Sequence, residues 1–289
     1  MRFGSSLDAT TLTGREVVTH VLRREVKAIA FNEPLIHEGT DLEGVHQLRV
    51  SARRLRSELQ AMRSVLPRDP WRELEEDLKW MGAVLGRLRD LDVLSELFAR
   101  HVTAGTVLHE TITDTLAHRR LRRRRDVIAM LDTSRYARIV KRLRRLRDDP
   151  SLGDVGETLA SELFLPPLWD AACRYLEVVG DPYERRSDEA LHRVRIASKK
   201  CRYNFEIAAM FAGEEAQAVA TSLEAIQDIL GKVQDRSLAV AFLDTLGLEE
   251  EADLDVRRAF RVEIGELRPQ WVAHFLDVRR GILEVFGSD

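Results

Sequence analysis

Two stretches of twelve residues decide the fold. Residues 45–56 are VHQLRVSARRLR, and residues 191–202 are LHRVRIASKKCR. An offset of 146 residues places histidine on histidine and basic residues on basic residues. A shorter match follows at an offset of 145, where LGRLRD at residues 85–90 meets LGKVQD at residues 230–235. Because self-similarity at a nearly fixed offset reports architecture, the sequence predicts a duplicated helical unit.

Both stretches are amphipathic at the period of an α-helix. The basic strip of the first copy contains His46, Arg49, Arg53 and Arg56, and that of the second contains His192, Arg195, Lys199 and Arg202. Apolar residues occupy the opposite faces, from Leu48 to Met62 and from Val194 to Ala208. The predicted core comprises Leu48, Leu55, Leu59, Leu78, Leu85, Val194, Phe205, Ile226, Leu230 and Trp271.

The basic strips indicate an anionic ligand. Like charges three and four residues apart on a helix repel by about 0.2–0.5 kcal/mol per pair. A solvated charged face is the ordinary alternative, but such a face interleaves acidic residues, and these strips do not. The recurrence of the same strip in both copies further favours a phosphate or polyanion site.

The chain outside the strips is typical of an all-α protein. Its 289 residues are 44% hydrophobic and 32% charged, with only 16 Gly and 8 Pro. The strongest cluster of helix-breaking residues spans 148–156. We therefore expect one domain over 1–289, with a first half over 13–149 and a second half over 157–289.

Helix boundaries follow from capping and breaking residues. Thr13 and Glu16 form a capping box that opens a helix ending near Ile29, before Asn32 and Pro34. Further helices are expected over about 42–66, 71–97 with a turn or kink at Gly86, 107–131, 136–146, 166–179, 188–211 and 216–240. C-terminal helices run to residue 286, with Pro269 kinking them or starting the last one.

Charge is unevenly distributed along a nearly neutral chain. The 45 Lys and Arg almost balance 48 Asp and Glu, for a net charge of −3. Residues 115–147, however, carry 13 basic and two acidic residues. Two isolated cysteines exclude a disulfide framework, and neither a signal peptide nor a membrane span is apparent. A reducing, cytoplasmic location is expected.

The doubled pattern H-x-x-R-x-x-x-[RK]-[RK]-x-R, followed each time by L-G-x-x-x-D, resembles the CHAD family, the conserved histidine α-helical domain. The resemblance spans about residues 13–286. It implies two four-helix bundles related by a pseudo-twofold axis, with a central basic groove or pore. It also implies inorganic polyphosphate as the ligand and association with polyphosphate granules. No ExExK motif of a CYTH domain is present, so the chain resembles a stand-alone CHAD protein.

The resemblance assigns polyphosphate binding to the motif residues His46, Arg49, Arg53, Arg54, Arg56, His192, Arg195, Lys199, Lys200 and Arg202. The candidate site is completed by residues of the LG motifs, of the basic region 115–147 and of a sparser basic strip in the second half, and by the neighbour of Arg202: Arg87, Arg89, Lys232, Arg119, Arg122, Arg123, Arg138, Arg142, Arg257, Arg261 and Tyr203. Where the first copy has Arg89, the second has Gln234, which removes one basic contact.

Three alternatives remain open at this stage. An enzyme of phosphate metabolism would need a metal or nucleophile, and no P-loop is present, so we expect no catalysis and no cofactor. Asp90, Asp92 and Asp235 could hold Mg²⁺, although ion pairing with arginines explains them better, and the isolated histidines make poor zinc ligands. A nucleic-acid binder would interleave aromatic residues with the cations, and the four tryptophans fit core positions instead.

A structural protein that docks an acidic partner is the third alternative. Polyphosphate remains the expected partner, with other phosphate or sulfate anions and granule proteins as further candidates and no membrane. Histidines among cations should lose their protons easily, and a bound polyanion would restore them, so affinity is expected to rise below about pH 7.

Overall fold

The structure, a computed structural model, describes residues 11–38, 42–66, 68–184, 187–247 and 251–287. The described residues are 88% helical and contain no β-strand, which confirms the all-α prediction. The α-helices are α1 (Gly14–Glu38), α2 (Leu42–Ala61), α3 (Arg68–His101), α4 (Val107–Leu131), α5 (Ser134–Asp148), α6 (Ala160–Val179), α7 (Asp188–Asp244), α8 (Glu251–Leu267) and α9 (Trp271–Phe286). None of the helices in the described ranges is long and apolar enough to cross a bilayer.

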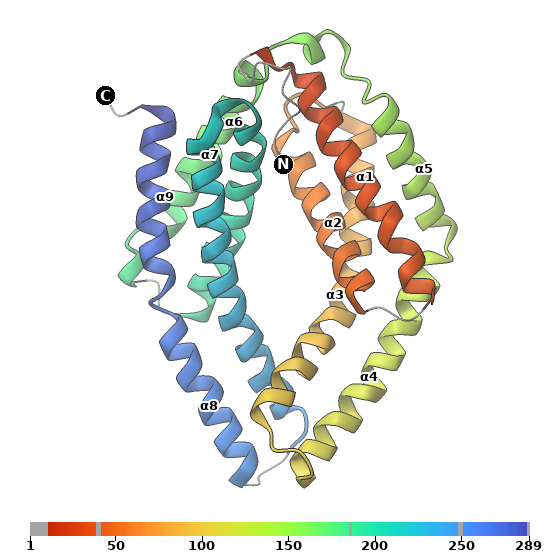
Figure 1. Cartoon of the computed structure of the whole chain (residues 1–289), viewed down its shortest axis with the longest axis vertical. Helices are drawn as coiled ribbons and strands as arrows, with labels where there is room; N and C mark the ends of the chain where they lie inside the picture. The colour runs from red at the N-terminus through yellow and green to blue at the C-terminus, as the bar shows by residue number, and fades with distance from the viewer. Residues whose placement is uncertain (1–10, 39–41, 67, 185–186, 248–250, 288–289) are drawn as a thin grey trace.

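Two long helices, α3 and α7, organise the molecule (Figure 1). In this view α1, α2 and α5 accompany the first part of α3 on one side, and α6 and α9 accompany the first part of α7 on the other. The final turns of α3 and α7 approach each other at the lower end, beside α4 and α8. The helices therefore form a broad upper part and a tapered lower part.

Two hydrophobic clusters hold these parts together. The larger one contains residues of every α-helix from α1 to α9. The smaller one joins the ends of α3 and α7 to α4 and α8, with Phe98 lying 5.5 Å from Phe242 and 5.8 Å from Phe260 between ring centroids. All ten predicted core residues are buried.

Both clusters mix the two halves. Each therefore depends on contacts between segments far apart in the sequence.

The starts of the helices keep the offset found in the sequence. The first residues of α1 and α6, and those of α2 and α7, are both 146 residues apart. A single antiparallel bridge joins Thr13 to Leu159, and its two hydrogen bonds run from Gly14 N to Thr158 O at 2.9 Å and from Ala160 N to Leu12 O at 2.7 Å. The offset exchanges these two bonds, so the contact itself has local twofold character.

Helix ends differ from the prediction where packing overrides local breakers. α1 continues past Asn32 and Pro34, because Ile36 is buried in the core and the Asn32 side chain donates to the Ala28 carbonyl at 2.7 Å. α6 starts at Ala160 rather than Pro166, because Phe164 is already buried. α2 ends at Ala61, followed by a turn, and no break occurs at Gly86.

Other expectations are confirmed or corrected. The capping box forms, since Thr13 N donates to Glu16 at 2.8 Å, and α7 bends at Gly213, whose φ is 83°. Cys201 is buried as expected. Cys173 and Trp169, expected in the core, are exposed because they lie on the outer face of α6.

Gly281 marks the closest approach of α9 to α7. A Cβ atom at this position would lie 2.5 Å from Cγ2 of Val219, whereas one at Gly265 in α8 would meet nothing within 4 Å. Gly281→Ala is expected to lower the free energy of unfolding by about 1–3 kcal/mol. Gly265→Ala should raise it by about 0.5–1 kcal/mol through helix propensity alone. Urea denaturation measures both, and equal effects would contradict the packing.

Candidate functional site

The basic strips of α2 and α7 come together between the two halves. Arg49 and Arg53 from α2 and Arg195 and Lys199 from α7 are half-buried, and their charges act on one another. We call these four residues the central cluster. Within the described ranges, none of them has a carboxylate oxygen within 4 Å of a side-chain nitrogen. The Nε atoms of Arg53 and Arg195 are buried and have no hydrogen-bond partner among the described residues.

Crowding of like charges changes the protonation chemistry of the cluster. Burial, together with the charges of Arg195, Arg53, Arg49 and Arg202, lowers the pKa of Lys199 to about 6. Burial and the nearby Arg53 also lower the pKa of Arg49 and of Arg195. Arginine nevertheless stays charged at neutral pH, so the lysine is the member of the cluster that gives up its proton.

Two glycines lie beside the two central arginines. A Cβ atom at Gly86 in α3 would lie 3.6 Å from Arg49 Nε, and one at Gly231 in α7 would lie 3.7 Å from an Arg195 terminal nitrogen. The guanidinium groups therefore pack against helix backbone that carries no side chain.

The aspartates that follow these glycines balance part of the charge. Asp90 and Asp235 both attract Arg195, and burial raises the pKa of both carboxyl groups. Asp92 accepts a hydrogen bond from Arg120 Nε at 2.8 Å, so it fixes an arginine as the sequence suggested. In the described part of the chain, no group of three or more His, Cys, Asp or Glu side chains is arranged to hold a metal ion.

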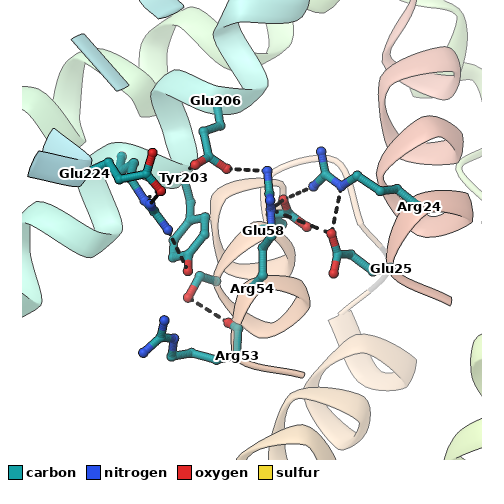
Figure 2. Close-up of polar contacts among 10 residues, drawn as sticks. Arg24, Glu25, Arg53, Arg54, Glu58, Tyr203, Glu206 and Glu224 are labelled. Atoms are coloured by element: carbon teal, nitrogen blue, oxygen red, sulfur yellow. Dashed lines mark hydrogen bonds and ion pairs between the residues drawn. The ribbon is translucent and has the colours of Figure 1, made fainter. Parts of the chain in front are cut away.

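Arg54, a predicted ligand, instead forms an ion-pair network (Figure 2). Its Nε lies 3.1 Å from Glu58, a fully buried carboxylate of the same helix, and its terminal nitrogen lies 2.7 Å from Glu206 on α7. Arg24 of α1 pairs with the same Glu58 and with Glu25. The network therefore ties α1 and α2 to α7 and leaves Arg54 engaged within the protein.

Arg202 and Tyr203 are engaged within the protein as well. Arg202 pairs with Glu224 at 2.5 Å and lies 4.9 Å from the centre of the Tyr203 ring. Tyr203 is only 1% exposed, so its ring has no face on which a ligand could stack.

The remaining candidates divide by their partners. Those half-buried beside the central cluster are His46 and Arg56. Six candidates are exposed and have no ion pair among the described residues: Arg87, Arg122, His192, Lys200, Lys232 and Arg261. Those paired with carboxylates are Arg89 with Glu96, Arg123 with Asp126, Arg142 with Glu73 and Arg257 with Asp253. Arg119 lies 5.0 Å from the Phe242 ring centre, and Arg138 donates to Ser134 at 3.2 Å.

Removal of the Arg54 side chain is expected to lower the free energy of unfolding substantially. Arg54→Met would leave Glu58 and Glu206 without this cation, and we expect a loss of about 2–4 kcal/mol in unfolding free energy. Arg193→Met, which breaks an exposed pair with Glu189 at 3.4 Å, should cost less than about 0.5 kcal/mol. Chemical denaturation of both variants compares them, and adding Glu58→Gln should recover part of the loss in the Arg54 variant.

Comparisons with known proteins agree with this architecture. The CHAD domain family profile matches residues 20–244. The crystal structure of the CHAD domain from the plant Ricinus communis superposes with a TM-score of 0.68 at 26% identity, covering 99% of this chain and 96% of that one. PptA from Streptomyces chartreusis shares the fold, with a TM-score of 0.65 at 19% identity over 93% of this chain and 99% of that one.

Two related proteins are considerably longer than this chain. Two Mycobacterium tuberculosis proteins described as uncharacterized, from strains CDC 1551 and H37Rv, are each 29% identical over 210 residues. The match covers 67% of this chain and 38% of each relative, so the chain spans well under half of their length. The chain belongs to the CHAD domain family, which is known generally to bind polyphosphate.

Proposed function

We propose that the protein binds inorganic polyphosphate at the central cluster and does not transform it chemically. The observation that carries this proposal is the meeting of Arg49, Arg53, Arg195 and Lys199 from two helices, with no carboxylate in ion-pair range within the described ranges. Cations that lose much of their hydration are ordinarily paired, and Asp90 and Asp235 balance only part of this charge, so four half-buried cations without an ion pair favour an anion supplied from outside the chain.

The chemistry of polyphosphate matches this cluster. The polymer carries about one negative charge per phosphate and offers no base to stack or read. Arginine donates forked hydrogen bonds to phosphate oxygens, and lysine contributes a mobile point charge. A bound polyanion would also relieve the repulsion among the four cations, which adds to the favourable free energy of binding.

The proposal is tested by measuring the affinity of the protein for long-chain polyphosphate and for an RNA of equal charge, and by competition between the two. We expect polyphosphate to bind tightly, with a slope of roughly −3 for log affinity against log salt concentration from the four cations alone. The slope should be steeper if the exposed strips also take part. RNA should compete poorly, because the buried Tyr203 offers no stacking face.

Three outcomes would contradict the proposal of polyphosphate binding without catalysis. Equal affinity for RNA would indicate general basicity, and affinity that does not depend on salt would exclude a polyanion site. Release of orthophosphate from the bound polymer would overturn the non-catalytic part. Association with polyphosphate granules belongs to the same proposal, and fluorescence microscopy of the tagged protein in granule-forming cells tests it.

A further inference from the structure

A cavity of about 620 Å³ lies where α2 and α3 of the first half meet α6 and α7 of the second. Its wall combines apolar and basic side chains. The apolar part comprises Pro167, Ala171, Val178, Ile196 and Ala197, and the basic part comprises Arg63, Arg174, Arg193 and Lys200. The volume lies within the range of about 300–1,000 Å³ that is usual for small-molecule sites.

The 146-residue offset relates this cavity to the ion-pair network of Figure 2. Lys200 corresponds to Arg54, which in the network contacts three carboxylates. The positions that correspond to those carboxylates, Glu25, Glu58 and Glu206, hold Ala171, Asn204 and Gln60. All three of these neutral residues line the cavity. One side of the molecule is therefore filled by ion pairs, and the equivalent place on the other side is open.

The substitutions leave the cavity with unbalanced positive charge. Among the described residues, Lys200, Arg63 and Arg174 have no ion pair, and Arg193 has only the exposed Glu189 at 3.4 Å. Glu75 is the one carboxylate of the wall, and it accepts a hydrogen bond from Gln60. A ligand that replaces the missing carboxylates would be an anion.

The apolar part of the cavity wall indicates which class of anion the cavity could bind. Ile196 is 43% exposed, and it forms an apolar surface of the wall together with Pro167 and Val178. An inorganic ion would leave this surface in contact with water, whereas an organic anion would cover it. Basic and apolar groups face the same volume, so one molecule can contact both.

We propose that this cavity binds a small organic anion, a carboxylate, phosphate or sulfonate that carries an apolar or aromatic group. The site is separate from the central cluster, because none of the four residues of that cluster lines the cavity. The inference therefore stands whether or not the protein binds polyphosphate.

Fluorescence titration with 8-anilinonaphthalene-1-sulfonate, an aromatic sulfonate, tests the proposal. We expect saturable one-to-one binding to the folded protein, weakened about tenfold in Lys200→Gln and in Arg174→Gln. The double variant Ala171→Glu with Asn204→Glu restores two of the missing carboxylates and should abolish binding. Arg279→Gln removes an exposed cation on α9 away from the cavity, and it should bind like the unaltered protein.

Other results would overturn the inference. Unchanged binding in Lys200→Gln and Arg174→Gln would place the dye elsewhere, and circular dichroism shows whether each variant is folded. Displacement of the dye by inorganic tripolyphosphate at lower concentrations than by an aromatic phosphate would assign the cavity to inorganic polyanions. Loss of polyphosphate binding in Arg49→Glu with Arg195→Glu, with dye binding retained, would separate the two sites directly.

Discussion

Replacement of Arg49 and Arg195 together by glutamate is expected to weaken polyphosphate binding at least a thousandfold at about 0.1 M salt. Each substitution removes hydrogen bonds between charged groups, which contribute about 1.5–3 kcal/mol apiece, and places a negative charge beside the polymer. Each glutamate would be attracted by Arg53 and Lys199, which now repel the arginines, and repelled by Asp90 and Asp235, so circular dichroism checks that the variant is folded. Isothermal titration calorimetry measures the affinity.

A matched control separates local from bulk charge. Arg258→Glu with Arg279→Glu changes the net charge equally at exposed positions of α8 and α9. We expect this control to lose less than tenfold. Equal losses in the two double variants would show that overall charge, and not the central cluster, determines binding.

The second large effect concerns pH. In the free protein, burial and four arginines hold the pKa of Lys199 at about 6, whereas a bound polyanion should return it towards the ordinary value of about 10.4. The bound form therefore holds more protons than the free form between these values, and affinity must fall as pH rises. Between pH 6 and pH 8 we expect a decrease of about 50-fold.

Lys199→Arg provides the decisive comparison. Arginine keeps the charge and cannot lose its proton, so the variant should retain tight binding at pH 8 and lose most of the pH dependence. Lys200→Arg, one residue away but lining the organic-anion cavity, should keep the dependence of the unaltered protein. An unchanged pH profile in Lys199→Arg would assign the effect to the histidines, as the sequence suggested, although His192 is exposed.

The sequence predicted the helices and their buried faces because a helix period is a local property. The buried positions of α2, such as Leu48, and of α7, such as Phe205, can be identified from the spacing of apolar residues alone. Helix ends were predicted less well, because the burial of Ile36 and Phe164 depends on contacts with distant helices. A proline costs about 3 kcal/mol in an isolated helix, and packing offsets that cost in α1 and α6.

The candidate site was predicted at the level of strips and not of individual contacts. Arg53 and Arg54 are neighbours in sequence, yet Arg53 joins the central cluster and Arg54 pairs with Glu206 on α7. Within α2, Glu58 lies four residues after Arg54 whereas Ser57 lies four residues after Arg53, so part of the difference is local. The second carboxylate, Glu206, is 152 residues away in the chain, and no pattern within one helix reveals it. The role of Lys199 likewise depends on Arg49 and Arg53 from the other half.

The two mixed hydrophobic clusters bear on how such a chain could arise. Phe98 and Leu116 from the first half pack with Phe242 and Phe260 from the second, so neither half alone buries all of its apolar surface. A single-copy ancestor could have made the same contacts only with a second chain. After fusion of two copies of its gene, the two halves could have changed independently in sequence. The ion pairs of Arg54 in one half and the open cavity at the equivalent Lys200 in the other are an example of such divergence.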